Sequence, residues 1–209
     1  MVGNALKFYK KSGMRTIARG TGLLKLLPGD AELADAYLPE LSDNFFVAKG
    51  QIHPAQGVRK AKVAMLAGCV MALTHADTLE ATVRVLTRNG IEVHLTTGQG
   101  CCGALNTHSG EPDTAIEMAK KNIDSFLSAK PDAIVSASAG CGAAMKDYGE
   151  LLANEPEYVD KAKQVADLSK DIHELLVEFE FEAPTKLMNV KVTYQDPCHL
   201  LNVQRITDA

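Results

Sequence analysis

The pattern of hydrophobic and polar positions changes near residue 61 of this 209-residue chain. Beyond that point, short apolar runs alternate with segments in which apolar residues recur every three to four positions. The short segments predict strands at 63–67, 91–95, 133–136 and 190–194, and the first of them, apolar at every position, is typical of a buried strand. The segments with helical spacing predict helices at 78–88 and 112–129, from about 141, and at about 156–168 and 171–179. Strands that alternate with helices predict an α/β fold with a parallel sheet flanked by helices.

Residues 1–30 follow a different pattern, which is basic and amphipathic. Six lysine and arginine residues occur before the first acidic residue, Asp30, and leucine, isoleucine, methionine and phenylalanine lie between them. Such a helical segment contacts a membrane surface or a partner, or it packs as a linker helix on its own domain, and both interpretations stay open. We expect 31–60 to be irregular chain that leads to the main domain. Together with the helical part at 1–30, it makes 1–60 a basic amphipathic helical linker segment.

Composition and charge exclude several functional classes. A net charge of −4 is not that of a general nucleic-acid binder, which normally carries a strongly basic domain. No apolar run approaches the roughly 18 residues that span a bilayer, and the N-terminus lacks the apolar core of a secretory signal. We therefore expect a cytoplasmic protein, in which cysteine thiols stay reduced.

Four of the five cysteines form one pattern. Cys101 and Cys102 are adjacent between two glycines, Cys69 lies upstream and Cys141 downstream, and each position follows a predicted strand. Because the carboxyl ends of parallel strands meet at one edge of a sheet, we expect the four thiols to lie close together. Neighbouring cysteines are poor disulfide partners, but both can face one iron-sulfur cluster. The pattern predicts a metal site, with Cys198 after the fourth predicted strand as a weaker candidate.

Three other interpretations compete with a cluster. A single cysteine is most often a small hydrophobe in a core. A structural zinc site usually contains Cys-x-x-Cys spacing, which is absent from the sequence. A cysteine nucleophile needs a nearby base, for which His108 and His199 are candidates, but this chemistry does not require two adjacent thiols and two remote ones. We rank all three below metal binding.

The cysteine pattern resembles a known family. Gly68-Cys69, then Cys101-Cys102-Gly103, then Gly140-Cys141-Gly142 resemble the cysteine-rich CCG module found in heterodisulfide reductases, lactate-utilisation proteins and the glycolate oxidase iron-sulfur subunit. The greatest likeness is to the glycolate oxidase subunit, and it extends to 12–28, 100–108, 138–149 and 194–200. The family implies a Rossmann-like sheet, with one CCG module at 61–189 and the start of a second at 190–209.

The resemblance also implies a function. It implies an iron-sulfur electron-transfer subunit of a glycolate oxidase or dehydrogenase, holding a [4Fe-4S] cluster on Cys69, Cys101, Cys102 and Cys141. A partner flavoprotein would oxidise glycolate to glyoxylate, and electrons would pass toward quinone at the inner face of the plasma membrane. The alternatives are a subunit of a lactate-utilisation or heterodisulfide-reductase-like complex, and a redox-silent module that binds a flavoprotein.

Two departures from the family pattern matter. The upstream ferredoxin-like region and the complete second module are absent from the sequence, so the chain resembles an internal or truncated fragment. The position of a fifth cysteine in the reductases is Ala144 here, which favours a four-cysteine site. We further expect a helix from Cys198 to about residue 206 to expose Leu200 and its apolar neighbours, and this tail to be mobile and prone to self-association.

Overall fold

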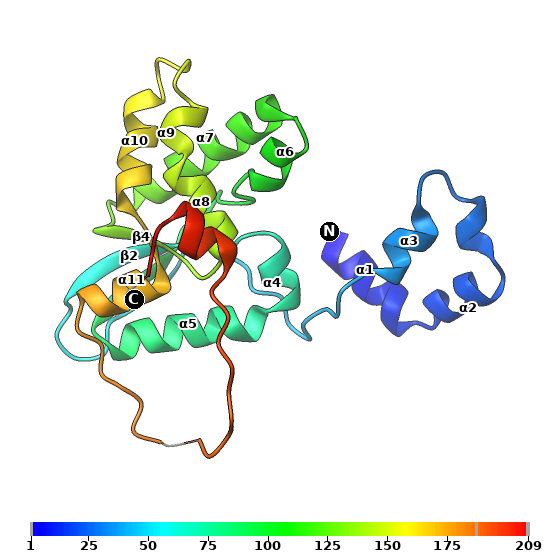
Figure 1. The fold of residues 1–209 in the computed structure, drawn as a ribbon, viewed down its shortest axis with the longest axis horizontal. Coiled ribbons are helices and arrows are strands. Elements are labelled where there is room, and N and C mark those ends of the chain that lie inside the picture. Colours follow the sequence, from blue (N-terminus) through cyan, green and yellow to red (C-terminus); the bar gives the residue numbers. More distant parts are fainter. Residues whose placement is uncertain (1, 187, 208–209) are drawn as a thin grey trace.

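The computed structural model describes residues 2–186 and 188–207 and is built around a five-stranded sheet of order β1-β3-β2-β4-β5 (Figure 1). The parallel strands are β2 (Ala61–Met65), β3 (Ile91–Leu95), β4 (Ala133–Ser136) and β5 (Ser169–Asp171). The edge strand β1 (Gln51–His53) pairs antiparallel with β3. The predicted α/β fold with a mainly parallel sheet is confirmed.

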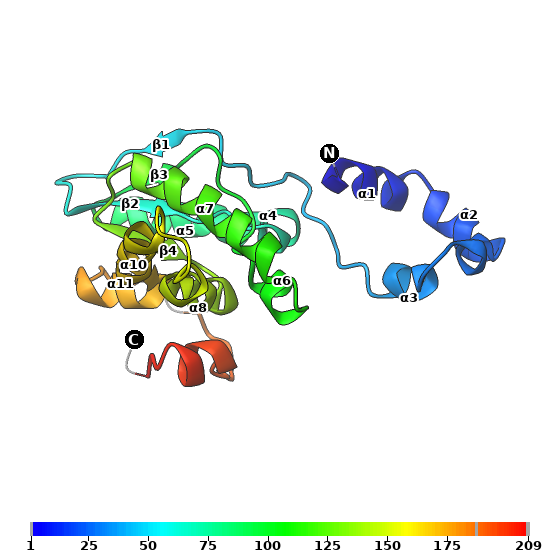
Figure 2. The ribbon, with the colours of Figure 1, turned by 90° about the horizontal axis from the view of Figure 1, so that it is seen from above.

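Helices cover both faces of the sheet (Figures 1 and 2). One face packs against α4 (Val70–Thr74), α5 (Ala76–Arg88) and α11 (Ile172–Glu178). The other packs against α6 (Ala104–His108), α7 (Pro112–Ser128), α8 (Ala139–Lys146), α9 (Tyr148–Leu151) and α10 (Val159–Leu168).

The central strand β2 shows why the apolar runs are continuous. Val63 and Met65 belong to the core on the side of α5, whereas Ala64 and Leu66 belong to the core on the side of α7. Successive side chains of a strand point to opposite faces, so a strand covered by helices on both sides must be apolar throughout. The run therefore marks a buried position in the middle of the sheet.

The predicted strand at 190–194 is wrong. Residues 188–197 have no regular structure, and Val190, Val192 and Tyr194 are exposed. The strand that pairs with β4 is instead β5. It has only three residues, and its sequence is polar, so it shows no apolar pattern from which a strand could be predicted. The short elements β1, α4 and α6 were also not predicted, and the expectation that 31–60 would be irregular is wrong where β1 and a helix at Ala31–Ala36 form.

The C-terminal turn (His199–Val203) is π-helical and packs on α8. Leu200 is only 5% exposed, and the side-chain amide of Gln204 donates to the carbonyl oxygen of Ala139 at 2.8 Å. The expectation that Leu200 would be left without packing is wrong, because α8 supplies the apolar surface. Val203, by contrast, remains 52% exposed.

The N-terminal residues form a small helical unit beside the main body (Figures 1 and 2). It contains α1 (Val2–Lys11), α2 (Met14–Gly20), the 3₁₀ turn η1 (Leu23–Leu26) and α3 (Ala31–Ala36). The buried carboxylate of Asp35 accepts hydrogen bonds from Tyr9 Oη at 2.9 Å, Arg15 Nε at 3.0 Å and Arg19 Nε at 2.5 Å. Burial raises the pKa of Asp35, but these donors and the two guanidinium charges outweigh it, so the pKa is lowered.

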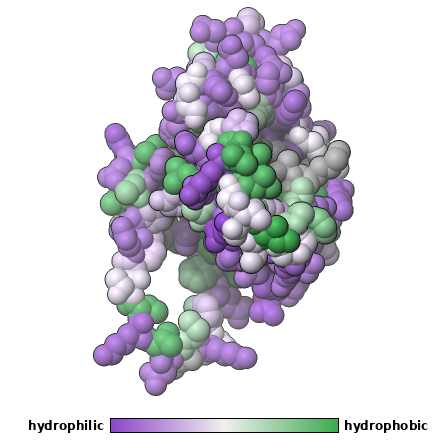
Figure 3. Space-filling view, turned by 90° about the vertical axis from the view of Figure 1, so that its right-hand side faces the viewer, coloured by the Kyte–Doolittle hydropathy of each residue, from purple (hydrophilic) through white to green (hydrophobic). Residues whose placement is uncertain are grey.

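Acidic residues that follow the basic segment neutralise much of its charge. Lys10 pairs with Glu40 at 2.9 Å and Lys11 with Asp43 at 2.7 Å, and Asp35 pairs with two arginines. Seen from the side of this unit, apolar side chains lie among hydrophilic ones (Figure 3), and Ile17 is among those exposed. Within the described part of the chain, no helix is both long enough and apolar enough to cross a membrane.

Candidate metal centre

The four predicted ligands lie together at the carboxyl edge of three neighbouring strands. Cys69 follows β2 and immediately precedes α4, Cys101 and Cys102 follow β3, and Cys141 lies in the first turn of α8 after β4. Strands β3, β2 and β4 are adjacent in the sheet. All four cysteines line one pocket of about 360 Å³. Three of them are partly exposed, and Cys102 is buried.

The thiols interact as two pairs. The Sγ atoms of Cys69 and Cys101 are 3.4 Å apart, and burial together with this contact raises the pKa of Cys69 to about 11. Hydrogen bonding with Cys102 lowers the pKa of Cys141 to about 6. The same bond, added to burial, raises the pKa of Cys102. In the metal-free chain, Cys141 is therefore the thiol that ionises most readily of those whose pKa is shifted.

Backbone groups at the pocket favour negative charge on sulfur. The amides of Val70 and Ala104 hydrogen-bond to the thiols of Cys69 and Cys102, which opposes the rise in their pKa values. The N-terminus of α8 adds the positive end of a helix dipole near Cys141. A methyl group at Gly140, which lines the same pocket, would meet no atom within 4 Å. The pocket is therefore open next to Gly140.

These residues fit an iron-sulfur cluster better than a single metal ion. Within 2–186 and 188–207, no group of three or more His, Cys, Asp or Glu residues is arranged to hold one ion. Structural zinc requires four ligands around one centre. A polynuclear cluster instead binds thiolates through separate irons. The four cysteines that line this pocket are the ligand set that such a cluster uses.

Three polar residues that sequence reasoning missed support the loops of this site. The side chain of Gln99 joins the end of β2, accepting from the amide of Ala67 at 2.8 Å and donating to the carbonyl of Met65 at 3.0 Å. Asn122 and Tyr148 bind the backbone of the turn that contains the adjacent cysteines. Asn122 carried a usable signal, because it interrupts the apolar face of the predicted helix at 112–129.

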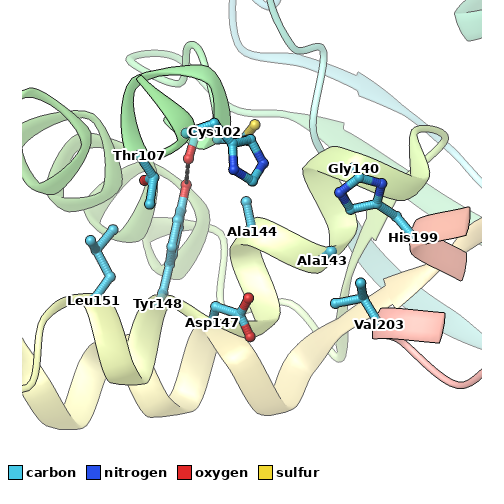
Figure 4. A pocket seen from close by; sticks show the side chains of 12 residues that line it. Cys102, Thr107, Gly140, Ala143, Ala144, Asp147, Tyr148, Leu151, His199 and Val203 are labelled. Atoms are coloured by element: carbon cyan, nitrogen blue, oxygen red, sulfur yellow. Dashed lines mark hydrogen bonds between the residues drawn. The ribbon is translucent and has the colours of Figure 1, made fainter. Parts of the chain in front are cut away.

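A second pocket of about 170 Å³ adjoins the cysteines (Figure 4). Cys102, Ala144 and Asp147 line it, together with both candidate histidines. The rings of His108 and His199 are 6.3 Å apart, centre to centre. Burial raises the pKa of Asp147, with a further contribution from Glu150. Among the residues that the structure describes, no hydrogen bond joins either histidine to a cysteine thiol.

The structure does not bring Cys198 to the other four cysteines. Its side chain is exposed, and it lines neither of these pockets. The reason is the missing fourth predicted strand, since without it Cys198 is not at the end of a strand in this sheet. Its neighbour His199 does reach both pockets.

Comparison with known families gives two matches. Residues 63–146 match the model of the cysteine-rich domain CCG, and residues 1–37 match the model of the glycolate oxidase iron-sulfur subunit linker region. The first match contains Cys69, Cys101, Cys102 and Cys141. The second covers the helices of the N-terminal unit. No solved structure matches the chain.

Individual relatives carry related names. The chain is 35% identical over 198 residues to the probable glycolate oxidase iron-sulfur subunit of Bacillus subtilis, covering 93% of this chain and 45% of the relative. It is 37% identical over 150 residues to the glycolate oxidase iron-sulfur subunit of Escherichia coli, covering 70% and 37%. Lactate utilization protein A of Bacillus licheniformis is 30% identical over 149 residues, covering 71% and 62%. The chain therefore spans less than half the length of the two glycolate oxidase relatives.

Proposed function

We propose, from the premise that this chain is a CCG-domain relative of glycolate oxidase iron-sulfur subunits, that it is an electron-transfer part of such an oxidoreductase. The observation that carries the proposal is the convergence of Cys69, Cys101, Cys102 and Cys141 on one pocket. We assign these four residues as ligands of a [4Fe-4S] cluster. Bound there, the cluster supplies one-electron redox chemistry.

The residues of the chain account for how the site would be held and reached. The thiols provide four ligands, and Ala144 supplies no fifth. Backbone amides of Val70 and Ala104 offset negative charge on sulfur. Partial exposure of three of the cysteines supports the docking of a partner protein at this edge of the sheet.

We assign the oxidation of glycolate to a partner flavoprotein, and we place electron delivery to quinone after this chain. The names of the relatives from Bacillus subtilis and Escherichia coli support glycolate as the substrate of the complex. The name of the relative from Bacillus licheniformis supports lactate utilisation as the second candidate. The recognition of either acid would belong to the partner, since the cysteine pocket contributes electron transfer.

An anaerobic reduction experiment tests this function. The chain is loaded with iron and sulfide and mixed with a glycolate-oxidising flavoprotein, and glycolate is added. We expect the iron-sulfur absorbance to bleach only when flavoprotein and glycolate are both present. A parallel reaction with a lactate-oxidising flavoprotein and lactate distinguishes the second candidate. A loaded chain that neither flavoprotein reduces, but that dithionite does reduce, would contradict the proposal.

A further inference from the structure

We infer that Asn122 and Tyr148 are positioning residues that hold the turn at residues 100–103 so that both adjacent thiols face one pocket. We call this turn the CCG turn and the two side chains the clamp. The inference rests on the proposed function, because it explains how neighbouring cysteines serve one site. The clamp residues belong to α7 and α9, which are distant from the CCG turn in sequence.

The contacts of the clamp are continuous. Asn122 Oδ1 accepts from the amide of Gly100 at 2.8 Å, and Asn122 Nδ2 donates to the carbonyl oxygen of Cys101 at 2.8 Å. Asn122 Nδ2 also donates to Tyr148 Oη at 3.1 Å. Tyr148 Oη in turn donates to the carbonyl oxygen of Cys102 at 3.0 Å (Figure 4). One amide and one hydroxyl thus bind three successive residues of the CCG turn.

The burial of the clamp shows that its polarity serves the turn. Asn122 and Tyr148 are both 0% exposed. Burying an amide or a hydroxyl without partners costs free energy, whereas apolar residues would fill the same core without that cost. Both amide hydrogens of Asn122 and the hydroxyl hydrogen of Tyr148 are used within this one network. The CCG turn is therefore what satisfies the clamp, and the clamp selects that conformation of the turn.

Peptide geometry connects the clamp to the direction of the thiols. In an extended strand, successive side chains and successive carbonyl groups alternate in direction. Here the carbonyl oxygens of Cys101 and Cys102 accept hydrogen bonds from the clamp side chains, which are also hydrogen-bonded to each other. Both carbonyls must then point to the same side, which bends the chain out of the extended form. The bend allows two successive thiols to line the same pocket.

The first test uses the metal-free protein and the variants Tyr148→Phe and Asn122→Asp. Phenylalanine keeps the buried ring and removes one oxygen atom, so the core stays filled. Tyr158→Phe is the matched control, because it also removes a tyrosine hydroxyl, one that donates to Asp124 at 2.7 Å on the surface. We expect alkylation of Cys102 to accelerate about tenfold in both clamp variants and to stay unchanged in the control, since one hydrogen bond limits the opening of the turn by about that factor.

The second test reads the loaded site by spectroscopy and by iron retention. After anaerobic addition of iron and sulfide, we expect Tyr148→Phe to show a changed EPR signal and about tenfold faster loss of iron to a chelator, while Tyr158→Phe matches the wild type. A general loss of stability would not change the EPR signal of protein that is still folded. This readout separates a positioning role from a merely structural one.

The outcomes distinguish the clamp from the proposed function. Wild-type protein that takes up no iron contradicts the proposed function, and the alkylation rates of Cys102 still decide whether the clamp exists. Clamp variants with the wild-type alkylation rate of Cys102 overturn the inference, even if the wild type binds iron normally. Faster alkylation in Tyr158→Phe as well would also overturn it, because the effect would not be specific to the clamp.

Discussion

Replacing Gly103 by alanine tests how the packing of α7 shapes the cysteine site. Gly103 ends the CCG turn with a φ of +87°, and a Cβ atom there would lie 3.3 Å from the Cα, Cβ and O atoms of Ala115 in α7. Gly98 is a matched control, because its φ is +86° and a Cβ atom would meet nothing within 4 Å. The two substitutions share the backbone strain and differ in crowding.

The expected loss of unfolding free energy is the sum of the backbone strain and the crowding. A left-handed conformation costs an alanine about 1–2 kcal/mol, and this applies equally to Gly98→Ala and Gly103→Ala. Overpacking adds about 1–3 kcal/mol at Gly103 only, since the backbone of α7 has to shift. We therefore expect losses of about 1–2 kcal/mol for Gly98→Ala and about 2–5 kcal/mol for Gly103→Ala.

Equilibrium unfolding of the metal-free protein in urea measures both losses, with far-UV circular dichroism as the signal. A thermal scan serves as a check, because a domain of this size shifts its melting temperature by about 2–4 °C per kcal/mol. Equal losses for the two variants would refute the reasoning, since the close approach of α7 to the CCG turn would then cost nothing. A larger loss for Gly98→Ala would refute it as well.

Further predictions concern the two ends of the chain. The pKa of Asp35 is lowered in the folded state, so its contribution to stability is present above the usual aspartate pKa and is lost as the pH falls below it. Hydrogen exchange in α1–α3, corrected for its intrinsic pH dependence, should therefore accelerate below about pH 4. Asp35→Asn should remove this acceleration. Exchange that does not accelerate in the wild type would contradict the role of Asp35. At the other end, Leu200→Ala should weaken the packing of the C-terminal turn by about 2 kcal/mol and speed its proteolysis, because the side chain is buried on α8. Leu201→Ala, at a position 37% exposed, should have a smaller effect, and equal effects would show that the turn does not pack as described.

The sequence predicted the central strands and the site because burial leaves a strong pattern. Strands β2 and β4 contribute buried residues to the cores on both faces of the sheet, and their central residues are apolar in succession. Strand β3 alternates instead, and buries Ile91, Val93 and Leu95 on the side of α5. The cysteines follow these strands, and the parallel arrangement alone brings their positions to one edge. The fold and the proximity of Cys69, Cys101, Cys102 and Cys141 were therefore accessible without the structure.

The remaining features depend on contacts between distant residues, which leave a weak local pattern. The β-branched and aromatic residues at 190–194 match a strand, but the segment becomes one only where a neighbouring strand pairs with it. The basic N-terminal segment suggests a charged face, and its acidic partners Asp35, Glu40 and Asp43 lie beyond the segment that shows the pattern. The contact between Asn122 and the CCG turn likewise joins residues about twenty positions apart.

The ligand assignment is the central claim, and the iron content of matched cysteine variants tests it most directly. Wild-type protein, Cys102→Ser and Cys198→Ser are each loaded anaerobically with iron and sulfide, and bound iron and acid-labile sulfide are measured per chain. We predict that Cys198→Ser retains the wild-type content and that Cys102→Ser loses most of it, because Cys102 lines the pocket and Cys198 does not. Equal retention by both variants, or loss in Cys198→Ser alone, would contradict the account.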